Sequence, residues 1–149
     1  MTERFTPHVT VAAVIARDNR FLMVEELIEG QVMYNQPAGH LEADESLTEA
    51  VEREILEETG WLATTEHYLG VCLYQAPAGT TFVRHTFVAL AKEHVPGATL
   101  DIGILRALWL TRDEIAGLAK QLRSPMILST IDQYLAGQLY PLAMVAHQR

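Results

Sequence analysis

Short apolar runs recur along the chain, with turn-forming residues between them. These strand-like runs cover residues 8–15, 21–26, 68–75, 82–91 and 107–110. The turn pair Asp18-Asn19 separates the first two runs, and this spacing predicts a β-hairpin. Pro77 and Gly79 mark a turn between the third run and the fourth, and residues 36–39 (Gln-Pro-Ala-Gly) predict a loop. These runs supply the strands of the predicted fold.

Three segments carry helical signals, over residues 46–59, from residue 112 onward and over residues 125–136. Ser46 and Glu49 form a capping box for the first helix, which Gly60 is placed to end. Thr111 and Glu114 repeat the same box at the second helix. Because mixed strands are followed by helices, we predict an α/β (α+β) sandwich, with residues 1–149 forming one domain.

The helix over residues 46–59 departs from the usual amphipathic pattern. At about 100° per residue its apolar side chains share one face, namely Leu47, Ala50, Val51 and Ile55. Glu54 and Glu58 fall within that same face, and Glu57 lies beside it. Neighbouring like charges destabilise a helix by about 0.2–0.5 kcal/mol per pair, and burying unpaired carboxylates costs far more. The arrangement therefore predicts a bound cation such as Mg²⁺, which prefers carboxylate and phosphate oxygens. A solvated acidic face is the alternative.

Composition narrows the class of function. The 149 residues are 49% hydrophobic and 20% charged, with a net charge of −8. That charge argues against duplex DNA or an anionic membrane as the partner, because both require a basic face. The first residues lack a signal-peptide pattern, which together with the single Cys72 predicts a cytoplasmic protein. We expect Cys72 to be a buried, inert thiol and the protein to be a monomer or a homodimer.

The residues in and before the acidic helix resemble the Nudix box. The defined positions of that box are met here by Gly39, Glu45, Arg53, Glu54, Ile55, Glu57, Glu58 and Gly60. The last position departs, because Trp61 stands where Ile, Leu or Val is usual. Trp61 is still a large apolar residue, so this departure casts little doubt on the fold.

The resemblance implies a Nudix α/β/α sandwich with a mixed β-sheet. It also implies hydrolysis of a nucleoside diphosphate linked to another moiety, or of a related pyrophosphate. By position, Glu54, Glu57 and Glu58 resemble the catalytic glutamates that hold Mg²⁺, with Mn²⁺ as an alternative metal. One of the three would also act as the general base.

Other positions of the box imply supporting roles. Arg53 resembles the arginine that orients the catalytic glutamates, and Glu45 resembles its ion-pair partner. In this family a carbonyl near the first glycine of the box often joins the metal shell, which here means Ala38 or Gly39. Without the box, Gly39 would be read as an ordinary turn glycine.

Segments outside the box are similar to the NudJ-type phosphatases of the same family. These segments are residues 36–42, residues 122–125 and Tyr140-Pro141-Leu142. Such phosphatases act on thiamine pyrophosphate, on hydroxymethylpyrimidine diphosphate and on nucleoside di- and triphosphates. The resemblance implies a small phosphorylated metabolite as the substrate, and neither a nucleic acid polymer nor a membrane as a partner. The alternatives are a pyrophosphatase for ADP-ribose or oxidised nucleotides, and a non-catalytic domain that senses a nucleotide.

Three residues are candidates for substrate binding. Arg84, in the run 82–91, suits a phosphate group, with a solvated cation on an edge strand as the alternative. His40 could contact substrate, although a lone histidine is more often structural. Tyr34 could stack on a base or pyrimidine ring, with packing in the core as the alternative.

Weaker candidates lie elsewhere in the chain. Arg123 and His85 could reach a phosphate or the substrate, and Phe82 could stack on a ring. Glu93 and Asp101 fall in a region where some members of the family supply a further acid. No pair of histidines or of histidine and cysteine has zinc-like spacing, so we expect no zinc site.

Overall fold

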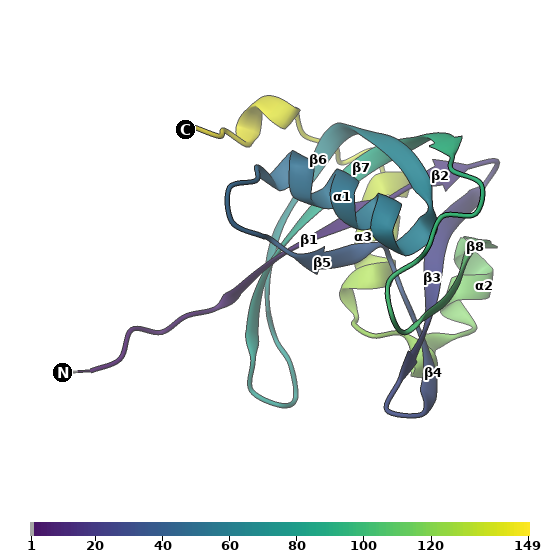
Figure 1. Ribbon diagram of the computed structural model, residues 1–149, viewed down its shortest axis with the longest axis horizontal. Helices are drawn as coiled ribbons and strands as arrows, with labels where there is room; N and C mark the ends of the chain where they lie inside the picture. Colours follow the sequence, from purple (N-terminus) through teal and green to yellow (C-terminus); the bar gives the residue numbers. More distant parts are fainter. Residues whose placement is uncertain (1) are drawn as a thin grey trace.

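The computed structural model describes residues 2–149, in which α1 lies between two groups of strands and the other helices follow the last strand (Figure 1). The strands are β1 (His8–Val14), β2 (Ala16–Arg17), β3 (Arg20–Ile28), β4 (Gln31–Asn35), β5 (Ala38–His40), β6 (Trp61–Gln75), β7 (Thr81–His94) and β8 (Ile104–Thr111). The helices are α1 (Leu47–Thr59), α2 (Arg112–Ala116) and α3 (Met126–Leu135), with short 3₁₀ turns η1 (Ala119–Gln121) and η2 (Leu142–Met144).

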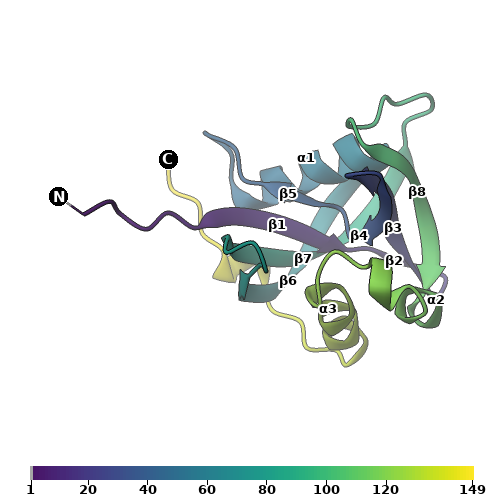
Figure 2. The same cartoon turned by 90° about the horizontal axis from the view of Figure 1, so that it is seen from below.

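The strands form two sheets, and helices cover both faces of the first. That sheet has the order β5-β1-β7-β6, in which β1 and β7 are parallel and the other pairs are antiparallel. The second sheet joins β2, β3 and β4, with β8 paired to β3. Figure 2 shows α1 on one side of the first sheet and α3 on the other. The predicted α/β/α sandwich with a mixed β-sheet is therefore confirmed.

The predicted hairpin of residues 8–15 with residues 21–26 is wrong. β1 pairs with β5 and β7. Of the two strands that precede β3, only the short strand β2 pairs with it. The turn lies where the sequence places it, because Asp18 and Asn19 both adopt positive φ. The strand β1 is buried from Val11 onward, so it belongs inside the first sheet, and the chain passes to the second sheet before it turns.

The predicted loop at residues 36–39 is partly a strand. Residues Ala38–His40 form β5, whose Gly39 pairs with Val11 of β1. The strands β6 and β7 are also longer than their apolar runs predict, and they form a long hairpin that extends beyond the body of the molecule (Figure 1). The short strand β5 is important for function, because it places the backbone of Gly39 against α1.

Helix α1 begins and ends as the sequence predicts. The Ser46 hydroxyl accepts a hydrogen bond from the Glu49 amide at 3.1 Å, and the Glu49 carboxylate accepts one from the Ser46 amide at 2.9 Å. Gly60, with φ of 76°, ends the helix in the left-handed conformation. Its apolar face packs on the first sheet, in a core that includes Val11, Ile15, Ala50, Val51, Ile55 and Phe87.

Helix α3 packs on the opposite face of the first sheet over a second core that includes Val14, Met23, Val88, Ile127 and Ile131. The capping box of α2 at Thr111 and Glu114 is present as predicted. Cys72 is exposed, so the expectation of a buried thiol is wrong. It lies on β6, an outer strand of the first sheet. Among residues 2–149, no helix is both long enough and apolar enough to cross a membrane.

Candidate functional site

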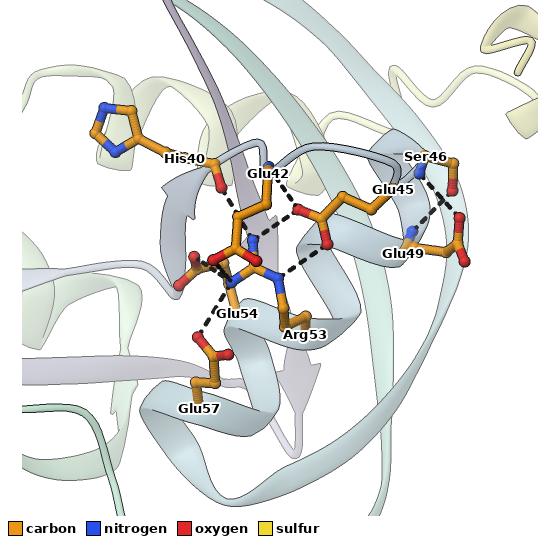
Figure 3. A network of polar contacts seen from close by, with 8 residues as sticks. All are labelled: His40, Glu42, Glu45, Ser46, Glu49, Arg53, Glu54 and Glu57. Carbon is orange, nitrogen blue, oxygen red and sulfur yellow. Dashed lines mark hydrogen bonds and ion pairs between the residues drawn. The ribbon is translucent and has the colours of Figure 1, made fainter.

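Arg53 on α1 gathers three of the four box carboxylates around one guanidinium group (Figure 3). Its Nε and Nη2 donate to the two oxygens of Glu45 at 2.9 and 2.7 Å. Its Nη1 donates to Glu54 at 2.8 Å and to Glu57 at 3.1 Å. Nη2 also donates to the carbonyl oxygen of His40 at 3.0 Å. Arg53 therefore joins α1, β5 and the segment before α1 in one network.

The ion pair between Arg53 and Glu45 keeps both of these groups charged. The bidentate contact with Arg53 lowers the pKa of the Glu45 carboxyl, and the same contact with Glu45 raises the pKa of Arg53. Glu45 directly precedes Ser46, the N-cap of α1, so the capping box holds it near Arg53. The structure thus brings Arg53 and Glu45 together, as the resemblance implies.

Three acids converge closely enough to share one cation. Carboxylate oxygens of Glu54, Glu57 and Asp101 lie within 4.8 Å of one another. Asp101 is held there because its amide donates to the carbonyl oxygen of Glu57 at 3.0 Å. Glu93, the other loop acid considered from the sequence, lies on β7, where it is exposed and pairs with Leu62. The further acid of this cluster is therefore Asp101.

Glu58 has a different environment from the other two box glutamates. Its carboxylate accepts a hydrogen bond from the Ala38 amide at 2.8 Å, and its side chain is not part of the three-acid cluster. Burial raises the pKa of Glu58 to about 9, and burial raises that of Glu54 to about 7 against the opposing effect of Arg53. Both acids are 7% exposed, so the buried position predicted by the helical wheel is confirmed.

Gly39 permits the close approach of β5 to the acidic helix. A Cβ atom at this position would collide with the carboxylate of Glu54. Only glycine leaves room for that carboxylate beside the strand, so Gly39 is more than a turn residue. The site therefore combines several carboxylate oxygens with a nearby strand backbone, and this oxygen-rich donor set fits a hard divalent cation.

Glu26 is a further acid of the site, and it is absent from the candidates that the sequence offers. It is 7% exposed at the end of β3, and its carboxylate pairs with Arg123 at 3.1 Å. Its charge helps to raise the pKa of Glu58, after the larger effect of burial. The signal that could have found it is an acid closing an otherwise apolar run, since residues 21–24 are all buried.

A pocket of about 270 Å³ opens beside the acidic helix. It is lined by Thr10, Glu26, Asn35, Ala38, Gly39, His40, Glu58, Tyr74, Phe82, Arg84, Arg123, Ser124 and Met126. The candidates Arg84 and His40 line it, as do the weaker candidates Arg123 and Phe82. Tyr34 does not line it. Its hydroxyl donates to Glu25 at 2.7 Å, and its ring packs against the second core.

Arg84 lies at the centre of the first sheet. It is 7% exposed on β7, which lies between β1 and β6, so the alternative of a solvated cation on an edge strand is wrong. Its Nη2 donates to the side-chain oxygen of Gln36 at 2.9 Å. Burial, with a smaller effect from Arg123, lowers the pKa of Arg84 to about 10, so the side chain stays cationic at neutral pH.

The two histidine candidates, His85 and His40, each lie within hydrogen-bond distance of another side chain. His85 Nδ1 lies 2.8 Å from the Tyr68 hydroxyl, and His85 does not line the pocket. The side chain of His40 lies on the rim, where its Nε2 is 2.9 Å from His8 Nδ1. The sequence therefore points to the acids of α1 and, as a weaker candidate, to Asp101, and the structure adds Glu26.

Comparison with known proteins agrees with this fold. The model of the NUDIX domain family matches residues 6–129. The chain belongs to the Nudix family, and it is a Nudix hydrolase, a class of enzyme that hydrolyses pyrophosphate linkages in small phosphorylated molecules.

Individual relatives are similar to this chain over nearly all of its length. The chain is 44% identical to Phosphatase NudJ of Escherichia coli strain K12 over 141 residues, which cover 95% of this chain and 92% of the relative. A solved NUDIX hydrolase from Nitrosomonas europaea superposes with a TM-score of 0.93 at 41% identity, covering 96% of this chain and 98% of that one. The NUDIX domain of Shewanella oneidensis NrtR, solved with ADP-ribose, shares the fold at a TM-score of 0.71 and 19% identity, over 91% of this chain and 90% of that one.

Proposed function

We propose that this chain is a Mg²⁺-dependent hydrolase of a phosphoanhydride in a small metabolite. Candidate substrates are nucleoside di- and triphosphates, thiamine pyrophosphate and hydroxymethylpyrimidine diphosphate. The observation that carries the proposal is the cluster of Glu54, Glu57 and Asp101, whose oxygens lie within 4.8 Å of one another. The similarity to Phosphatase NudJ over nearly the whole chain supports the substrate class.

The residues that would hold the cation come from two parts of the chain. Glu54, Glu57 and Glu58 lie on α1, and Asp101 joins the first two from the segment between β7 and β8. The carbonyl oxygen of Ala38 or Gly39 would complete the shell from β5. A bound divalent cation supplies neutralisation of phosphate charge and acidification of water. One of the box glutamates accepts the proton of the water that attacks phosphorus, while the leaving phosphate takes the electrons of the broken P–O bond.

Arg53 and Glu45 act as positioning residues in this proposal. Arg53 donates to Glu54 and Glu57 at the same time, so it fixes the spacing of two carboxylates that would otherwise repel each other. Glu45 in turn holds the guanidinium through two hydrogen bonds. This geometry is set before substrate arrives, which lowers the reorganisation that the reaction requires.

Substrate would occupy the pocket beside the cluster. Arg84 and Arg123 place two positive charges in its wall, and the exposed His40 lies at its rim. Glu58 belongs to both the pocket wall and the acidic helix, so a phosphate chain in the pocket ends next to the carboxylates. This proximity is what hydrolysis of a phosphoanhydride needs.

The test is a panel of substrates assayed with Mg²⁺, with Mn²⁺ and with EDTA, in which all products are identified. The panel contains thiamine pyrophosphate, hydroxymethylpyrimidine diphosphate, nucleoside di- and triphosphates, oxidised nucleotides and ADP-ribose. We expect metal-dependent turnover of the first three classes. Preference for ADP-ribose or for oxidised nucleotides would replace the substrate class, and binding without turnover would indicate a sensing domain.

A substitution tests the role of the cluster directly. We expect Glu57→Gln to lower kcat by about 10²–10³-fold, because it removes one charge from the acid cluster while keeping the shape of the side chain. The matched control is Glu66→Gln, which neutralises an exposed acid on β6 and should leave kcat unchanged. Near-normal turnover by a folded Glu57→Gln variant would contradict the assignment.

A further inference from the structure

The part of the pocket lining that comes from β7 is aromatic at Phe82 and cationic at Arg84. Phe82 and Arg84 are two residues apart on this strand, so their side chains stand on the same face, about 7 Å apart along the strand. Tyr74 is the cross-strand partner of Phe82, and the two rings stack at 6.5 Å with an interplanar angle of 21°. Thr10 is the partner of Arg84 on the other side. The pocket therefore has an aromatic end and a cationic end.

The cationic end contains two polar atoms that have no partner. Arg84 Nε and Ser124 Oγ are buried, and neither makes a hydrogen bond within residues 2–149. Their residues are 7% and 9% exposed and approach the pocket from β7 and from the segment before α3. A buried donor without a partner costs about 1–3 kcal/mol. Such a cost is offset when a ligand supplies the missing acceptor.

The start of α3 adds positive potential at the same place. Pro125 is the N-cap of this ten-residue helix, and it offers no side-chain acceptor to the free amides of the first turn. Ser124 and Met126, on either side of it, both line the pocket. An uncapped helix start favours a negative ligand through its free amides and its dipole.

The acids of the pocket restrict where an anion can lie. Glu26 and Glu58 line the same cavity and would repel a phosphate without a cation. Arg123 already pairs with Glu26, whereas Arg84 pairs with no carboxylate among residues 2–149. Arg84 and Ser124 are therefore the lining residues that offer unpaired donors to an anion without a metal.

We propose that Arg84 Nε and Ser124 Oγ form an anion subsite for the phosphoryl group next to a flat ring of the substrate, and that Phe82 and Tyr74 hold this ring. The inference rests on the proposed function for its substrate, and it assigns the specificity of that same pocket. The next phosphoryl group then lies toward Glu58 and the acid cluster.

The test measures binding without turnover. Benzyl phosphate and methyl phosphate are titrated in EDTA against the full chain, with chemical-shift changes in NMR spectra as the readout. We expect benzyl phosphate to bind tighter than methyl phosphate, because only the first has a ring for Phe82 and Tyr74. Equal affinity of the two ligands would overturn the ring site, and no binding of either at the highest soluble concentration would overturn the anion subsite.

Three variants separate the two halves of the subsite. We expect Ser124→Ala to weaken both ligands by about tenfold, and Arg84→Lys by about tenfold or more, since lysine keeps the charge and loses the Nε–H donor. We expect Phe82→Leu to weaken benzyl phosphate by about fivefold and to leave methyl phosphate unchanged. The matched control is Ser129→Ala on α3, because Ser129 does not line this pocket and its hydroxyl donates to the Met126 carbonyl oxygen.

The outcomes also separate this inference from the proposed function. A Ser124→Ala variant with wild-type affinity for both phosphates would overturn the subsite, whatever the wild-type enzyme hydrolyses. Wild-type protein that shows the ring preference in EDTA, yet hydrolyses nothing with Mg²⁺, would instead overturn the proposed function. With active protein, Ser124→Ala should raise KM for aromatic diphosphates by about tenfold and change kcat little, because it loses a contact present before the reaction.

Discussion

Helices α1 and α3 lie on opposite faces of the same sheet, and they bury different chemistry. The buried residues of α3 are Met126, Ile127, Thr130 and Ile131, and the one hydroxyl among them donates to the Met126 carbonyl oxygen at 2.7 Å. The buried face of α1 includes Glu54 and Glu58, whose pKa values burial raises to about 7 and about 9. One face of the sheet therefore contributes mainly stability, whereas the other gives up some stability to hold a group of buried acids.

Ile131→Ala on α3 should give the largest effect on stability. Ile131 is fully buried in the second core, so truncation leaves a cavity and should cost about 2–5 kcal/mol of unfolding free energy. Chemical denaturation measures this loss. The turnover of the molecules that remain folded should match wild type, because the residue lies outside the pocket. A large fall in kcat at full folding would show that the two faces are not independent.

Glu54→Gln on α1 should give the opposite result. Activity should fall by about 10²–10³-fold, or about 2.7–4 kcal/mol of barrier, because a carboxylate of the acid cluster is lost. The unfolding free energy without metal should stay the same or rise, because an amide costs less to bury than a carboxylate. Steady-state kinetics and denaturation of the same sample check both parts. A marked loss of stability with kinetics intact would reverse the comparison.

The sequence predicts α1 better than any other part of the molecule. Its capping box, its terminal glycine and the glutamates on its apolar face can all be recognised within a short stretch of sequence. The structure contains each of these features as predicted. The arrangement of β1 was mispredicted, because a turn pattern at Asp18-Asn19 cannot specify which of two sheets the preceding strand joins. Pairing with the distant strand β7 depends on tertiary contacts that no window of sequence contains.

The residues of the site also differ in how well the sequence predicts them, depending on whether they lie close together in the chain. Glu54 and Glu58 could be placed from helical periodicity, and Arg53 and Glu45 from the box, since all lie close in sequence. Asp101 reaches the cluster from a distant segment and was only a weak candidate. The sequence does not indicate that Glu26 lines the pocket, and it suggests a contact with substrate for Tyr34, which does not line the pocket. The direction of a side chain near the end of a strand depends on the packing of neighbouring elements.

The pH dependence of stability without metal should distinguish the two faces further. Burial raises the pKa of Glu54 from 4.5 to about 7 and that of Glu58 from 4.5 to about 9. Between these limits the folded state binds more protons than the unfolded state, so stability should fall as pH rises from about 5 toward 9. The slope is at most about 1.4 kcal/mol per pH unit for each group.

Thermal unfolding in EDTA across this range measures the fall, and Glu54→Gln should flatten its lower part between about pH 5 and 7. Adding Mg²⁺ should raise the melting temperature more at high pH than at low pH, because a cation binds the ionised carboxylates. Stability in EDTA that is independent of pH would show that burying Glu54 and Glu58 does not destabilise the folded state. The contrast between α1 and α3 would then be wrong.

The smallest effect should come from the charges on the outer surface of α3. Arg112 of α2 pairs with Asp132 of α3 at 2.8 Å, but the two side chains are 38% and 50% exposed. Solvent screens such a pair, so Asp132→Asn should change the unfolding free energy by less than about 1 kcal/mol and leave kcat unchanged. Denaturation at low and high salt checks this expectation. We thus expect the same loss of one carboxylate to have a large effect on turnover at Glu54 and almost none at Asp132. What distinguishes the two acids is therefore enclosure beside other carboxylates, since both lie on a helix that covers the same sheet.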